Sequence, residues 1–180
     1  MLKRIAAVLL LVGLVLPHSC GVRPVVGAWD GMSTTIMFGI PVLVTIAYAL
    51  HQLVPALARF HERHGAALHG VFRAVCLVLL GVYVGVALDD DVEPRLRIAT
   101  AASFVVTGAL IYWQQSRGTK TQRLPLLLLT IVGVATIYAF VGWVADGLQY
   151  GGWAFTAAWL LAVSAEVAGL RVAAAVERAG

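Results

Sequence analysis

Long apolar stretches separated by short polar segments recur along the whole chain and limit what it can fold into. Only 12% of its 180 residues are charged, whereas soluble domains carry about 25%. With so few charges the chain cannot cover a water-facing surface. Several of the apolar stretches reach the roughly 20 residues that a helix needs to cross a bilayer. The sequence therefore predicts an all-α integral membrane bundle without a separate soluble domain.

We expect six transmembrane helices in a single transmembrane domain that covers residues 1–180. Pro41 and Pro55 lie inside the second span, and each should kink or end its helix because proline lacks a backbone donor. Residues 59–64 are expected to form a loop. The six predicted spans are about 5–22, 34–57, 70–88, 96–113, 124–143 and 152–175.

The first predicted span has the features of a secretory signal, with a basic start before the apolar run Ile5–Leu16. The small residues Val26-Gly27-Ala28 would suit cleavage. Cys20 would suit lipidation, but Pro17 stands three residues before it, where a lipoprotein signal usually has leucine. We favour an uncleaved first span.

Basic residues gather at one end of the predicted spans and set the expected orientation. Lysine and arginine are enriched in the cytoplasmic loops of membrane proteins. Three arginines fall on the opposite face: Arg23, Arg95 and Arg97. The other basic residues, ten of 13, fall on one face: Lys3, Arg4, Arg59, Arg63, Arg73, Arg117, Lys120, Arg123, Arg171 and Arg178. Both termini are therefore expected in the cytoplasm.

Two short stretches carry a resemblance. Leu16-Pro17, with Ser19-Cys20-Gly21, forms the end of the first span, and Tyr150-Gly151-Gly152-Trp153 leads into the last one. Both resemble segments of bacterial multi-pass membrane proteins of unknown function. The resemblance implies a bacterial inner (plasma) membrane.

Small residues follow one face of the third and of the sixth predicted span. Such strips let membrane helices approach closely, because lipid tails give no hydrophobic drive for association. The third span carries Gly81 and Gly85. The sixth span carries Ala158, Ala162, Ala165 and Gly169 on one face, with Ala154 one turn earlier. We expect the third and sixth spans to pack against each other through these strips.

Glu166 lies at the edge of the small-residue face of the sixth span. A carboxylate inside a membrane is costly and is usually paired. Counting 1.5 Å per residue from the inner boundary gives Glu166 and Arg73 similar depths. We therefore predict an intramembrane Glu166–Arg73 ion pair. It would act either as a packing contact or as part of a proton or ion path.

Histidines and acidic residues suggest further sites without completing one. His51 and Gln52 are polar residues on the inner side of the second span. His51 with His69 would be the haem alternative, and His61 with His64 a metal alternative. We predict neither a cofactor nor a metal. A solvated acidic outer loop is predicted from Asp89, Asp90, Asp91 and Glu93.

No motif for nucleotide binding, hydrolysis or redox chemistry is present. We therefore expect a non-enzymatic subunit, anchor or assembly component that works through helix–helix packing. Its partners would be the lipid bilayer, other membrane subunits or further copies of itself, and not nucleic acid. A small proton- or ion-coupled transporter or channel that uses Glu166 and Arg73 is the alternative. A haem- or quinone-linked electron-transfer subunit is a second alternative.

Overall fold

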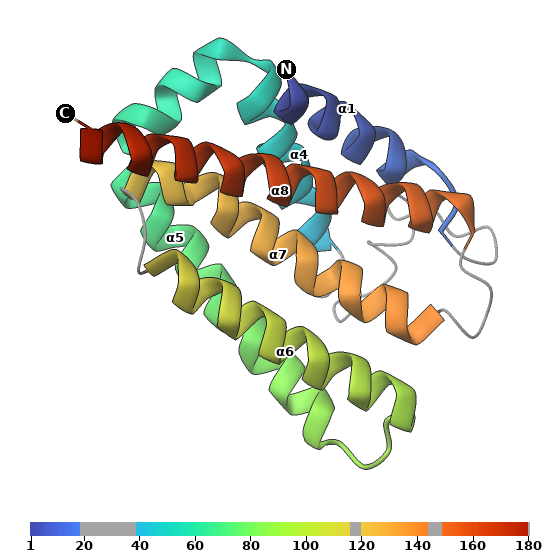
Figure 1. The fold of residues 1–180 in the computed structure, drawn as a ribbon. Coiled ribbons are helices and arrows are strands. Elements are labelled where there is room, and N and C mark those ends of the chain that lie inside the picture. Colours follow the sequence, from blue (N-terminus) through green and yellow to red (C-terminus); the bar gives the residue numbers. More distant parts are fainter. Residues whose placement is uncertain (19–38, 116–119, 144–148, 180) are drawn as a thin grey trace.

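The structure is a computed structural model that describes residues 1–18, 39–115, 120–143 and 149–179. The described residues form six α-helices and no strand (Figure 1). The all-α fold class is therefore confirmed. The end of the first predicted span, the beginning of the second and Cys20 lie outside the described residues.

Helix length and apolarity single out two of the six helices. Among the described residues, only α5 and the part of α8 from Tyr150 to Gly169 are long and apolar enough to cross a membrane. Helices α1 and α4 have 14 residues each, which at 1.5 Å per residue is about 21 Å, less than the roughly 30 Å of a hydrocarbon core. Six spans are therefore not confirmed. The helices are α1 (Leu2–Val15), α4 (Ile40–Leu53), α5 (Pro55–Leu88), α6 (Pro94–Gln115), α7 (Lys120–Trp143) and α8 (Tyr150–Ala179).

Prolines account for the early ends of α1 and α4. The residue before a proline avoids the helical conformation because the pyrrolidine ring crowds it. Leu16 precedes Pro17 and is extended, with φ −76° and ψ 150°. Val54 precedes Pro55 and is also extended, with φ −107° and ψ 105°. Pro55 thus ends α4 as expected, and α1 ends at Val15, short of the predicted 22.

The loop expected at residues 59–64 is instead helical and belongs to α5. Alanine, leucine, arginine and glutamate are favourable in helices, and they dominate the stretch after Pro55. No second proline follows to stop the helix. The polarity of this segment was therefore misleading, because it marks a polar helical segment and not a loop.

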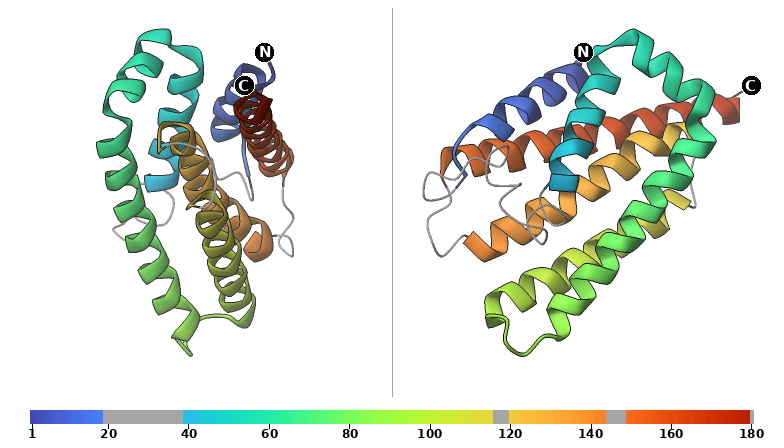
Figure 2. Two further views of the ribbon diagram at one scale, coloured as in Figure 1. Left: turned by 60° about the vertical axis from the view of Figure 1, so that its left-hand side comes forward. Right: turned by 180° about the vertical axis from the view of Figure 1, so that it is seen from behind.

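Helix α7 lies at the centre of the bundle and packs against α4, α5, α6 and α8 (Figures 1 and 2). Every residue from Leu124 to Val134 is buried. A helix that is apolar on all sides is expected to be buried in this way. The Trp159 indole N–H on α8 donates to the Leu129 carbonyl at 2.7 Å, and Gly133 leaves room for the indole ring, which a Cβ there would overlap.

Helix α1 runs antiparallel along α8. A Cβ on Gly13 would lie 2.9 Å from the Phe155 ring, so the two backbones approach closely near the end of α1. The Gly151 N–H at the beginning of α8 donates to the Pro17 carbonyl at 3.2 Å. Both termini lie at the end of the bundle opposite the α5–α6 turn (Figure 2).

Candidate functional site

A buried carboxylate connects three helices near the N-terminus. Glu166 on α8 is only 4% exposed. Its Oε2 accepts from the Lys3 ammonium of α1 at 2.6 Å. Its Oε1 accepts from the Gln52 amide at 2.9 Å and from the Tyr48 hydroxyl at 3.3 Å. We call Lys3, Tyr48, Gln52 and Glu166 the carboxylate cluster.

The positions of the donors follow from local structure. Tyr48 and Gln52 are four residues apart on α4 and therefore share a face. Lys3 lies in the first turn of α1, and the antiparallel packing of α1 along α8 brings this turn beside Glu166. Three hydrogen-bond donors, of which Lys3 also carries the opposite charge, offset the penalty of burying the carboxylate. The cluster therefore holds α1, α4 and α8 together and keeps a titratable group below the surface.

The predicted Glu166–Arg73 pair is wrong. Lys3 takes the position assigned to Arg73, while the Arg73 side chain is exposed on α5 and forms no ion pair with any described residue. The physical reason is the neighbour relation, because α8 lies along α1 and α7, with α5 on the far side of α7. Similar depth could not reveal which helices are adjacent.

Two histidines connect α4 to the beginning of α5. The Nδ1 atoms of His51 and His61 are 2.8 Å apart, and their rings stack with centroids 4.7 Å apart. Such a contact needs one protonated and one unprotonated Nδ1. The structure thus places His51 against His61, across the break at Pro55.

Among the described residues, no group of three His, Cys, Asp or Glu side chains is arranged to hold a metal ion.

The small residues of α8 pack inside the chain. Ala158, Ala162 and Ala165 are buried. They lie on the face that carries Phe155 and Glu166, both of which contact α1. The two ends of the predicted strip differ, since Ala154 and Gly169 are exposed. A Cβ on Gly169 would lie 3.3 Å from the Lys3 Nζ.

The small residues of α5 are open. Within the part of the chain that the structure describes, a Cβ added at Gly81 or Gly85 would meet nothing within 4 Å. Val78 shares their face at helical spacing and is 59% exposed. We call Val78, Gly81 and Gly85 the open face of α5. The expected packing of the α5 strip on the α8 strip is therefore wrong.

The acidic segment forms the exposed turn between α5 and α6. The Asp91 N–H donates to the Asp89 Oδ1 at 3.0 Å. Asp90 pairs with Arg97, and Glu93 pairs with Arg95, each at 3.1 Å. Exposed ion pairs of this kind contribute little to stability.

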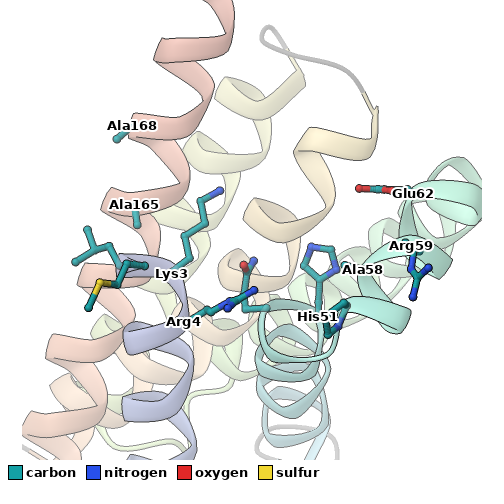
Figure 3. A pocket seen from close by; sticks show the side chains of 12 residues that line it. Lys3, Arg4, His51, Ala58, Arg59, Glu62, Ala165 and Ala168 are labelled. Carbon is teal, nitrogen blue, oxygen red and sulfur yellow. The ribbon is translucent and has the colours of Figure 1, made fainter.

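A pocket of about 650 Å³ lies beside the carboxylate cluster, between α1, α4, α5 and α8. Lys3 and Arg4 line it from α1 (Figure 3). His51 and Arg59 line it from α4 and α5. In the sequence, Lys3, Arg4 and Arg59 indicated only the orientation of the chain. The spacing of Tyr48 and Gln52 was the one signal that could have indicated a shared polar face.

Comparison of the chain with protein families, with curated proteins and with solved structures gave no match.

Proposed function

We propose that this chain is a six-span protein of a bacterial inner membrane, with both termini in the cytoplasm, that acts as a non-enzymatic subunit, anchor or assembly component. It would work by packing its helices against those of another membrane protein. The proposal is supported by two candidate membrane helices in an all-helical bundle.

The open face of α5 is the observation that carries this proposal. Glycines in a membrane helix let a second backbone approach closely. In this chain, α1 and α8 already use small residues in that way, since Gly13 lies against Phe155. Gly81 and Gly85 have no such neighbour within the described residues. A transmembrane helix of another protein would complete the contact.

The arrangement of charge supports the proposed orientation. Lys3, Arg4 and Arg59 come together at one end of the bundle. The acidic turn lies at the opposite end of α5 (Figure 1). Basic residues favour the cytoplasmic side, so the pocket end would face the cytoplasm.

The proposal is tested by mild extraction of the full chain from its own membranes, followed by native mass spectrometry. We expect another polypeptide bound to the wild-type protein and lost in Gly81→Leu and Gly85→Leu, because a leucine side chain would fill the space that a partner backbone needs. Gly108→Leu on α6 is the matched control, since a Cβ there also meets nothing within 4 Å. An equal loss of the bound polypeptide in all three variants would contradict the proposal.

The buried carboxylate favours a second candidate, a small proton- or ion-coupled transporter or channel. Glu166 is nearly inaccessible yet adjoins a large pocket, and intramembrane carboxylates often mark proton or ion paths. Lys3 would be the ion-pair partner of Glu166 in this path, a role that the sequence predicted for Arg73. In proteoliposomes, Glu166→Gln should abolish a coupled flux while leaving the fold intact. A normal flux in that variant would exclude this role of the carboxylate.

A further inference from the structure

The pocket at the beginning of α1 and α5 has the size and position of a ligand site. Its volume of about 650 Å³ falls within the range of about 300–1,000 Å³ that is common for small-molecule pockets. Lys3 and Arg4 enter it from α1, whereas Arg59 and Glu62 lie on its opposite side (Figure 3).

The pocket carries more positive than negative charge. Glu166 already neutralises Lys3. Arg4 and Arg59 form no ion pair with any residue in the described ranges. Glu62 is the one remaining carboxylate in the lining. Among the lining side chains without an ion pair, Arg4 and Arg59 against Glu62 leave an excess of one positive charge, which favours an anion.

The N-terminus of α1 adds to this preference for an anion. Its first residues, Leu2 and Lys3, line the pocket. The helix has neither a side-chain cap nor an acidic residue in its first turn. The N-terminus of a helix carries unsatisfied N–H groups and a partial positive charge, both of which favour anions.

From these observations we propose that the pocket binds a phosphate group, held by the guanidinium groups of Arg4 and Arg59. Guanidinium groups match phosphate oxygens in bidentate geometry. The phosphate could belong to an anionic lipid headgroup, since basic pockets between helices on the cytoplasmic side bind such headgroups. It could equally belong to a water-soluble phosphate ester. This site is independent of the proposed partner contact on the open face of α5.

The proposal is tested with the purified full-length protein in neutral detergent micelles. Binding of phosphatidylglycerol is measured by native mass spectrometry and compared with that of diacylglycerol with the same acyl chains. We expect phosphatidylglycerol to bind more tightly. Arg4→Gln combined with Arg59→Gln should weaken its binding about tenfold or more.

The matched control is Arg63→Gln combined with Arg73→Gln. All four arginines are exposed, but Arg63 and Arg73 lie outside the pocket lining, and their substitution removes the same charge. We expect binding within about twofold of wild type, because arginines outside the pocket cannot contact the phosphate and attract it only across screening solvent. An equal loss in the control pair would overturn the proposal. So would phosphatidylglycerol binding no tighter than diacylglycerol, together with no binding of inorganic phosphate.

Two further measurements separate the sources and guard against misfolding. Displacement of phosphatidylglycerol by millimolar inorganic phosphate would indicate a water-soluble phosphate ester, whereas binding that resists phosphate would indicate a lipid headgroup. If the double arginine variant does not fold, Glu62→Gln serves instead, since it leaves both arginines in place. It should tighten binding of the anion, and unchanged or weaker binding would overturn the proposal.

Discussion

Helices α8 and α5 both carry small residues at helical spacing, yet these residues have opposite surroundings. On α8, Ala158 and Ala162 are buried on the face that meets α1. On α5, Gly81 and Gly85 have open space where a Cβ would be. Small residues permit close approach in both helices, but only the neighbouring helices decide whether that approach occurs within the chain. The contrast predicts that substitutions with similar chemistry will have opposite effects in the two regions.

The largest effect is expected where α8 begins against the end of α1. A Cβ at Gly151 would overlap the Pro17 carbonyl oxygen and the backbone of Leu16, and backbone atoms cannot move aside as a flexible side chain can. We expect Gly151→Ala to lower the free energy of unfolding by about 3 kcal/mol or more. Thermal unfolding in detergent checks this. Gly108→Ala, made at an open site, is the control, and equal stability of the two variants would contradict the packing described.

The next effect concerns the Lys3–Glu166 pair and is asymmetric. Lys3→Gln leaves the buried carboxylate without its opposite charge, whereas Glu166→Gln leaves a lysine whose side chain is 40% exposed and able to reach water. We expect Lys3→Gln to destabilise by about 2–3 kcal/mol, below the roughly 3–5 kcal/mol seen for fully buried pairs. Glu166→Gln should lower stability by only about 1 kcal/mol. Denaturant or thermal unfolding of both variants checks the order, and a larger loss for Glu166→Gln would reverse our interpretation.

A smaller, pH-dependent effect is expected at His51 and His61. Their Nδ1···Nδ1 hydrogen bond exists while at least one imidazole is neutral, because two imidazolium rings would both be donors. Two imidazolium rings with Nδ1 atoms 2.8 Å apart would repel each other, so the second ring is protonated only at a pH well below the ordinary imidazole pKa of about 6.5. This contribution should therefore be present at pH 8 and lost only as the pH falls well below 6.5. We expect a loss of about 1 kcal/mol in the wild type. His61→Ala should be less stable at pH 8 and should show a smaller pH dependence, and an unchanged pH dependence would contradict the contact.

The smallest effect is expected on the open face of α5. The methyl groups added by Gly81→Ala and Gly85→Ala would meet no described residue, and alanine is favoured over glycine inside a helix by about 0.5–1 kcal/mol. Each variant of the isolated protein should therefore be slightly more stable in detergent. A loss of stability would show that α5 packs inside the chain, as the sequence first indicated.

The all-α class followed from the sequence because apolar stretches and helix lengths depend on local composition. The effect of Pro55 followed for the same reason, since it acts on the residue directly before it. The partner of Glu166 could not be predicted, because depth along a helix is a one-dimensional quantity. The depth of a residue along its helix does not reveal that α1, and not α5, lies beside α8.

The central position of α7 was also missed. Its run from Leu124 to Val134 is leucine-rich on every side, a pattern typical of a buried helix, but every apolar stretch of a membrane protein resembles it. Burial against protein and burial against lipid require the same residues. The tertiary arrangement is needed to separate them.

Site-specific photocrosslinking in intact membranes tests the central claim most directly. A photoreactive residue is placed at Val78 on the open face of α5 and, as a control, at Val105 on α6, which is 66% exposed. We predict a discrete protein adduct from position 78 and only lipid adducts from position 105. Lipid adducts alone at both positions would contradict a helix partner on α5 and would favour the transport role of Glu166.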